Sequence, residues 1–309
     1  MRTTLWDDFK MYVLNSGNTL NKLLAVNIAV LILFGLIWMV DHLFATNLDL
    51  DTVLKTYVVG FPSSPIMALK RPWTIVTYQF VHDGFFHLLF NMMMLLVAGR
   101  IFREFLGDKK LLNVYLLGGA AGALMFMLAV NIFPIFGHGE VVLIGGNLIQ
   151  LNYFTVIGAS ASVIAILAAA ATLVPNYTLF LVLIGPVRLI YIMLFFFLVD
   201  IISLGSSNSG GHFAHLGGAL FGFVYIKTLQ NGTDIGAWLT RFFDWLRNLF
   251  KPKANIRVSY RSNEPAKPSG PRHVSQDEVD AILDKIAKSG YDSLSQREKD
   301  ILFRASKDN

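Results

Sequence analysis

One serine and one histidine in this chain have the surroundings that acyl-transfer chemistry needs. Ser160 lies near the start of an apolar segment, 154–174, and His215 lies at the start of another, 213–229. A serine hydroxyl becomes a nucleophile when a histidine accepts its proton, and the same histidine then protonates the leaving group. An ionisable residue inside a membrane-length apolar segment is a functional candidate by default. We therefore interpret Ser160 as a nucleophile and His215 as its base.

Two further polar residues could serve the same reaction. His87 and Asn91 are four residues apart in the apolar segment 85–98, so they share one face of a helix. Both can donate hydrogen bonds to an oxyanion, and both would otherwise be costly polar groups in lipid. For any one of these residues alone, a buried polar network that holds helices together is the better interpretation. For all four together, catalysis is the better one.

Small residues predict that the helices carrying Ser160 and His215 touch. Gly158 precedes the serine, and Gly218 and Gly222 follow the histidine at positions i+3 and i+7, on its own face. Glycines at this spacing let helix backbones approach closely within a membrane. The two reacting side chains are within reach of each other only if this contact forms.

Other polar residues are given structural roles. Ser162 is about 200° around the helix from Ser160, so we interpret it as a packing residue. Asp200 is interpreted as a capped or solvated carboxylate at a helix end, although it could in principle orient a histidine. The remaining histidines considered are interpreted as loop residues: His82, His138 and His212.

The pair His212 and His215 has i, i+3 spacing that could suggest a metal. No Cys, Asp or Glu ligand is seen to join the pair, so the sequence predicts no metal site and no cofactor. The chain has no cysteine, which excludes disulfides and thiol catalysis.

Composition indicates a polytopic membrane protein. The 309 residues are 54% hydrophobic and only 15% charged, whereas soluble domains are about 25% charged. No Lys or Arg occurs within 111–187 or within 189–226. The expected partners are the lipid bilayer and transmembrane protein substrates, with no nucleic acid; the oligomeric state is left open.

The predicted fold is all-α, with a bundle of six transmembrane helices and a small soluble helical tail. Each apolar segment approaches the length needed to cross the hydrocarbon core. The predicted spans are 23–40, 85–98, 111–133, 154–174, 187–204 and 213–229. The predicted domains are an N-terminal cytoplasmic segment 1–22, the membrane domain 23–229, an interfacial amphipathic helix 230–250, a flexible linker 251–273 and a helical hairpin 274–309.

Basic residues set the expected orientation. The cluster in 100–110 and the other basic residues next to spans fall on one side if both termini are cytoplasmic, as in a bacterial inner membrane. The four candidate residues then share the outer layer, with Ser160 about two turns into its helix and His215 in the first turn of its own. The Gly- and Ser-rich segment 205–211 is expected to be a mobile loop that admits water.

The tail carries two capping boxes, Ser275 with Glu278 and Ser295 with Glu298. They predict two short helices after the linker. Their function is not readable from the residues.

In these motifs the chain resembles the rhomboid family of intramembrane serine proteases. The segments that carry the resemblance are Arg71-Pro72-Trp73, Phe86-His87-Leu88-Leu89-Phe90-Asn91, Gly99 with Glu104, Gly158-Ala159-Ser160, and Ala214-His215-Leu216-Gly217-Gly218 with Gly222. The resemblance implies a six-helix rhomboid fold, with Ser160 as nucleophile, His215 as base, and His87 and Asn91 around the oxyanion. The tail also resembles one found on some bacterial rhomboids.

The chain departs from the family pattern at three places. Ala161 follows the nucleophile where the family usually has glycine, and Ile164 stands where an aromatic residue often packs on the histidine. Thr74 follows Trp73 where the family often has arginine. None of these changes removes a reacting group.

We expect a serine endopeptidase that uses a Ser160–His215 dyad to cleave transmembrane proteins near the outer membrane boundary. The alternative is a catalytically inactive rhomboid-like protein that binds or holds membrane clients. A transporter is disfavoured because there is no inverted repeat and few charged residues line the spans.

Overall fold

The computed structural model describes residues 4, 6–7, 10–44, 46, 48–137, 139–206, 208–249 and 275–306. The chain divides into two compact units, Met1–Lys251 and Pro252–Asn309. The predicted linker 251–273 and the predicted loop residue His138 lie outside the described residues.

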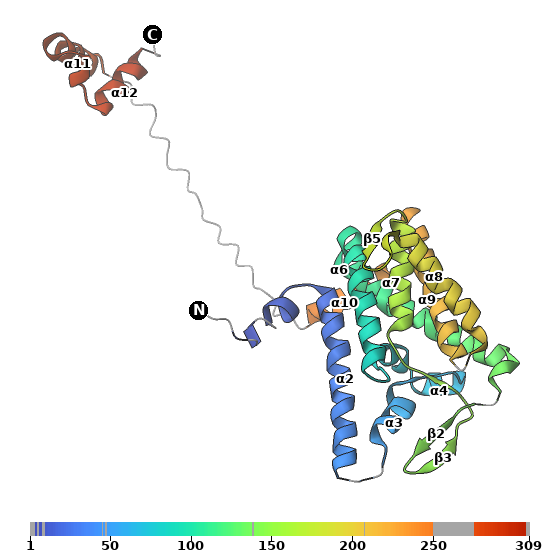
Figure 1. Ribbon diagram of the computed structural model, residues 1–309. Helices are drawn as coiled ribbons and strands as arrows, with labels where there is room; N and C mark the ends of the chain where they lie inside the picture. The colour runs from blue at the N-terminus through green and yellow to red at the C-terminus, as the bar shows by residue number, and fades with distance from the viewer. Residues whose placement is uncertain are drawn as a thin grey trace. The chain divides into compact units, whose positions relative to one another are not determined.

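The first unit is built mainly of helices (Figure 1). Its helices are η1 (Lys10–Leu14), α2 (Thr19–Leu43), α3 (Leu50–Leu54), η2 (Lys55–Val59), α4 (Pro65–Lys70), α5 (Thr74–Thr77), η3 (Tyr78–Phe80), α6 (Phe85–Ile132), η4 (Pro134–Phe136), α7 (Ser160–Leu173), α8 (Leu189–Ile202), η5 (Ser203–Gly205), α9 (Ser209–Gln230) and α10 (Ala237–Leu249). Its strands are β1 (Phe61–Pro62), β2 (Val141–Ile144), β3 (Asn147–Gln150), β4 (Thr155–Val156), β5 (Thr178–Leu181) and β6 (Gly185–Arg188).

The expectation of an all-α protein is wrong in this detail, because the strands form three two-stranded antiparallel sheets. β2 pairs with β3 and β5 pairs with β6 as local hairpins. β1 pairs with β4, so that Phe61 lies opposite Val156 although the two residues are far apart in the sequence. This last pair connects the first loop to the residues just before Ser160.

α6 is broken at Gly107, which adopts φ +78° and ψ 175°. A residue with a side chain rarely adopts this conformation, so glycine is suited to the break. The predicted spans 85–98 and 111–133 lie on either side of it. Most of 99–110, between the predicted spans, continues the two helices.

Small residues bring α6, α7 and α9 into close contact (Figure 1). A Cβ added at Gly118 would lie 2.3 Å from the Cβ of Ala165, and one added at Gly222 would lie 2.1 Å from the Ala165 carbonyl oxygen. A Cβ at Gly218 would lie 2.2 Å from the carbonyl oxygen of Ala161. The predicted contact between the helices of Ser160 and His215 is therefore confirmed.

Among the described residues, two helices are long and apolar enough to cross a membrane, α2 and α6. The segments Ser160–Leu173 and Leu189–Gly205 are shorter apolar helices. The six predicted spans correspond to α2, the two parts of α6, α7, α8 and α9.

Two helix starts differ from the prediction, and both differences move the candidate residues. α7 begins at Ser160 instead of residue 154, because β4 is extended and Gly158 has φ +127°. α9 begins at Ser209, so that part of the predicted 205–211 loop is helical. Ser160 therefore lies at the first position of its helix and His215 almost two turns into its own, the reverse of the expected order.

The second unit contains α11 (Gln276–Ser289), η6 (Tyr291–Ser293) and α12 (Gln296–Ala305). The Ser275 hydroxyl accepts a hydrogen bond from the Glu278 backbone N–H at 3.3 Å, and Glu298 accepts from the Ser295 backbone N–H at 2.7 Å. The predicted helix starts in the tail are confirmed.

Candidate active site

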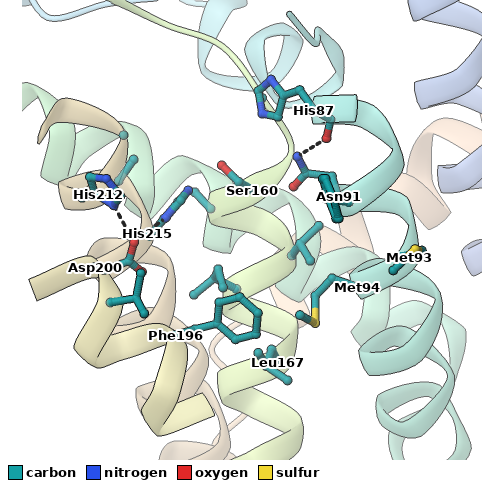
Figure 2. Close-up of a pocket in the computed structure, with 18 of the residues that line it drawn as sticks. His87, Asn91, Met93, Met94, Ser160, Leu167, Phe196, Asp200, His212 and His215 are labelled. Atoms are coloured by element: carbon teal, nitrogen blue, oxygen red, sulfur yellow. Dashed lines mark hydrogen bonds and ion pairs between the residues drawn. The ribbon is translucent and has the colours of Figure 1, made fainter. Parts of the chain in front are cut away.

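The four candidate residues line one cavity of about 1000 Å³ between α6, α7, α8 and α9. Ser160 projects from the start of α7, His87 and Asn91 from the first turns of α6, and His215 from α9 (Figure 2). Most of the remaining wall is apolar, including Phe196 and Leu167.

The start of α7 places Ser160 in this cavity. The backbone N–H of Gly158 donates to the Tyr78 carbonyl at 2.9 Å, which holds the approach strand beside the first loop. The next residue with helical geometry is Ala159, and Ser160 opens the helix. Its hydroxyl makes no hydrogen bond to His215 in the described part of the chain. In free enzymes a nucleophile and its base are often separated more than in the substrate complex.

His215 is held by a carboxylate from a neighbouring helix. Its Nδ1 lies 2.8 Å from Oδ1 of Asp200, and Nδ1 of His212 lies 2.8 Å from the same oxygen (Figure 2). Asp200 is only 5% exposed. An ionised carboxylate only accepts hydrogen bonds, so each imidazole donates its Nδ1–H. In a neutral His215 ring, Nε2 is then the nitrogen with a free lone pair.

These contacts correct two expectations. Asp200 is neither solvated nor a helix cap, because it is buried and accepts from two imidazoles. His212 is not a loop residue, because it lies in α9. The sequence did contain a signal, since Asp200 is the one charged residue in the apolar sequence of α8, and such a residue is a functional candidate by default. The assumption that no acidic residue joins the histidine pair was wrong.

His87 has the opposite proton arrangement. Its Nδ1 accepts a hydrogen bond from the Asp83 backbone N–H at 3.3 Å, so in the neutral ring Nε2 carries the proton and is a donor. A Cβ added at Gly158 would lie 3.1 Å from this Nε2 and 3.7 Å from Ser160 Oγ. The missing side chain of Gly158 therefore leaves space between a hydrogen-bond donor and the serine hydroxyl.

Asn91 is tied to its own helix. Its amide nitrogen donates to the His87 carbonyl oxygen at 2.8 Å, and its side chain is largely buried. An amide nitrogen has two hydrogens, so one remains for another acceptor in the cavity.

Ser162 has a packing role, as predicted. It is fully buried, and its hydroxyl donates to Gln79 Oε1 at 3.0 Å. The neighbouring Ala161 occupies space that a glycine on α6 leaves free, since a Cβ at Gly122 would lie 2.5 Å from the Ala161 Cβ. Ile164 is buried and lines the cavity. Position 164 therefore supplies no aromatic ring to stack on His215. The hydrogen bond to Asp200 positions this histidine instead.

A further histidine lies behind His87, outside the apolar helices. His82 is 1% exposed, and its ring meets that of His87 edge-on, with 5.0 Å between centroids. Within the described ranges, neither ring nitrogen of His82 has a hydrogen-bond partner. Burial, and after it the charge of His87, lower the pKa of His82 to about 4. His82 is therefore a neutral residue that supports His87.

Two family models match parts of this chain. A family model described as the rhomboid domain matches residues 69–231, which include all four candidate residues. A second model, described as a family of unknown function (DUF6576), matches residues 270–308. No curated protein shows a significant match to the chain. Because the rhomboid match covers more than half of the 309 residues, this chain belongs to the rhomboid family, a family of intramembrane serine proteases.

Proposed function

We propose that this protein is an intramembrane serine endopeptidase in which Ser160 is the nucleophile and His215 the general base. The observation that carries the proposal is the convergence of Ser160, His215, His87 and Asn91 on one cavity, with the His215 ring oriented by Asp200. In the first step Ser160 Oγ attacks the scissile carbonyl carbon while its proton passes to Nε2 of His215. In the second, the imidazolium protonates the leaving amine.

Asp200 acts in this reaction as a positioning residue. Its hydrogen bond keeps the proton of His215 on Nδ1, which leaves Nε2 free to accept from Ser160. The negative carboxylate also stabilises the imidazolium that forms during attack. A carboxylate in this role goes beyond the Ser–His dyad that the sequence suggests.

The oxyanion is bound on the opposite side of Ser160. His87 supplies its Nε2–H, and Asn91 supplies the amide hydrogen that is not bonded to its helix. Gly158 keeps the space between them and the serine open. Fixed donors at this position stabilise the charge that develops in the tetrahedral intermediate.

The substrate class follows from the membrane setting. Rhomboid proteins act on transmembrane substrates within the bilayer. We place the two ends of this chain on the cytoplasmic side of a bacterial inner membrane, from the basic residues beside the apolar segments. The cavity then opens near the outer boundary, where the transmembrane segment of a substrate would be cleaved.

A fluorophosphonate serine probe tests the proposal directly. The detergent-solubilised protein is expected to be labelled at Ser160, as shown by peptide mapping. Ser160→Ala should abolish labelling and Ser162→Ala should keep it, since Ser162 is bonded to Gln79 away from the cavity. Labelling of Ser162, or none in a folded sample, would overturn the assignment.

The second candidate function is an inactive relative that binds membrane clients. The observation that favours this alternative is that no hydrogen bond joins Ser160 to His215 among the described residues. It predicts a folded protein that captures transmembrane segments, never reacts with the probe and never cleaves them.

A further inference from the structure

We propose that Asp200, His212 and His215 also form a binding site for one divalent transition-metal ion of the Zn²⁺ type, and that the bound ion inhibits the enzyme. Metal binding is argued from the cluster alone. Inhibition rests on the proposed function of His215 as base.

The three side chains offer their ligand atoms in a compact group. One ligand atom from each lies within 4.8 Å of the others. The two histidines are three residues apart on α9, so both project from one face of the helix toward α8, which carries Asp200. Zn–N and Zn–O bonds of about 2.0–2.2 Å place tetrahedral ligands roughly 3.3 Å apart. The two 2.8 Å separations from Asp200 would widen by about 0.5 Å to admit an ion.

Charge also favours a cation at this position. The Asp200 side chain is 7% exposed, and its ion-pair partners among the described residues are the two imidazoles. No Lys or Arg occurs within 189–226, which includes both helices of the cluster up to Ile226. A buried carboxylate without a permanently charged partner is costly, and a divalent ion would supply that partner.

The cluster is also accessible from the cavity that contains Ser160. The side chains of His212 and His215 are 17% and 20% exposed, and all three residues line the cavity that contains Ser160. Three protein ligands with a fourth position for water is a common zinc arrangement.

Metal binding and catalysis require opposite proton positions on His215. As base, His215 needs its proton on Nδ1 and a lone pair on Nε2. As a metal ligand through Nδ1, a neutral imidazole carries its proton on Nε2. Nε2 then faces Ser160 as a donor and cannot accept its proton. A bound ion would therefore switch off nucleophile activation without covering Ser160.

The experiment uses the full chain, without a histidine tag, in detergent. The chain has no cysteine, so no thiol competes for the metal. Zn²⁺ binding is measured by competition with a chromogenic chelator, and Co²⁺ binding by its visible absorption. We expect one ion per chain, loss of fluorophosphonate labelling in proportion to occupancy, and full recovery of labelling with EDTA.

A matched pair of variants separates this site from adventitious binding. His212→Asn keeps an amide that can donate to Asp200 but removes a ligand, and His212 is outside the catalytic machinery. It should retain labelling without metal and weaken Zn²⁺ binding by at least about 100-fold, more than the usual effect of losing an outer-shell partner. The control His42→Asn removes a histidine in α2, outside the cavity, and should remain as sensitive to Zn²⁺ as the parent protein.

The outcomes distinguish the two proposals. Active protein that binds no ion, or a His212→Asn variant as zinc-sensitive as the parent, would overturn the metal site and leave the protease intact. One-to-one metal binding that depends on His212, in protein never labelled even with EDTA, would establish the site and overturn the inhibitory role together with the proposed function.

Discussion

His215 and His87, which line the cavity with Ser160, hold their protons on opposite ring nitrogens. His215 donates from Nδ1 to Asp200, so its Nε2 is an acceptor, whereas His87 accepts at Nδ1 from the Asp83 backbone, so its Nε2 is a donor. One imidazole is thereby prepared to take a proton and the other to stabilise negative charge. The proposed division of roles between base and oxyanion donor rests on these two hydrogen bonds.

The first prediction separates these roles by mutation. His215→Asn should lower turnover of a model transmembrane substrate by orders of magnitude, because general base catalysis and nucleophile activation are lost together. His87→Ala should cost less, roughly 10²–10³-fold at most, because one oxyanion donor is removed while Asn91 remains. The comparison is made on one substrate at matched thermal stability. Near-full activity of His215→Asn beside an inactive His87→Ala would reverse the assignment.

The second prediction concerns Asp200. Asp200→Asn should lower kcat about 100-fold or more with little change in KM, since an amide can donate to Nδ1 and favour the wrong tautomer. Asp200→Ala should be no worse than Asp200→Asn. A residue that only packs would give the opposite order, because asparagine preserves the shape of aspartate.

A buried aspartate that does not line the cavity provides the control. Asp41 is 3% exposed and accepts from the Leu50 backbone N–H at 3.2 Å. Asp41→Asn should retain kcat even if it lowers Tm. Equal losses of kcat in the variants of Asp41 and Asp200 would assign both effects to folding.

At the scale of elements, the cavity is shaped by how closely α7 and α9 approach. Gly218 and Gly222 place the α9 backbone against the carbonyl groups of Ala161 and Ala165. The β1–β4 pair and the positive φ of Gly158 then decide where α7 begins. Together these features set the separation of Ser160 from His215.

The third prediction tests the helix contact. Gly222→Ala places a Cβ 2.1 Å from a backbone oxygen, so α7 and α9 must separate, and such overpacking costs about 1–3 kcal/mol. Both Tm and labelling should fall. Gly35→Ala in α2 has no atom within 4 Å of the new Cβ and should be neutral or stabilise by about 0.5–1 kcal/mol. If both variants melt at the same temperature, the contact is unimportant for stability.

The fourth prediction concerns the loop before α6. The pKa of His82 is lowered to about 4 from its ordinary value of 6.5 by burial. Between these pH values the unfolded chain binds more protons than the folded protein, so the free energy of unfolding falls as pH decreases through this window. His82→Phe keeps a ring against His87 and removes the titration. The difference in Tm, variant minus parent, should therefore increase as the pH is lowered from 7 to 4. A difference independent of pH would contradict the burial argument.

At the scale of the whole molecule, the residues of the proposed reaction all belong to one unit. The cavity is lined within Met1–Lys251, and the tail helices form a separate unit with its own caps and a Lys285–Glu298 ion pair of 2.8 Å. The division indicates that the proposed reaction does not require the tail helices.

The fifth prediction follows from that division. A chain that ends at Leu249 should be labelled at Ser160 and should cleave a model transmembrane substrate at a rate similar to the full chain, with Ser160→Ala as the inactive control. Loss of turnover in the shortened chain, at unchanged Tm of the membrane unit, would make the tail part of the mechanism.

The sequence alone predicted features that are local, or that depend on residues whose polarity differs from that of the segment around them. Polar residues stand out in apolar segments, so Ser160, His215, His87 and Asn91 could be chosen as candidates, and the structure brings them to one cavity. Glycines at helical spacing predicted the contact between α7 and α9. Capping residues predicted the tail helices. Each of these signals is readable within a few turns of one helix.

Only the tertiary structure decided what depends on residues far apart in the chain. The start of α7 is set by β1, whose pairing with β4 shortens the predicted span and moves Ser160 to the first helical position. From the sequence, Asp200 is interpreted as a carboxylate at a helix end. In the structure α8 packs beside α9, and Asp200 Oδ1 lies 2.8 Å from Nδ1 of two imidazoles. Propensity and periodicity describe one element at a time, whereas the hydrogen bond that orients His215 comes from an atom on another helix.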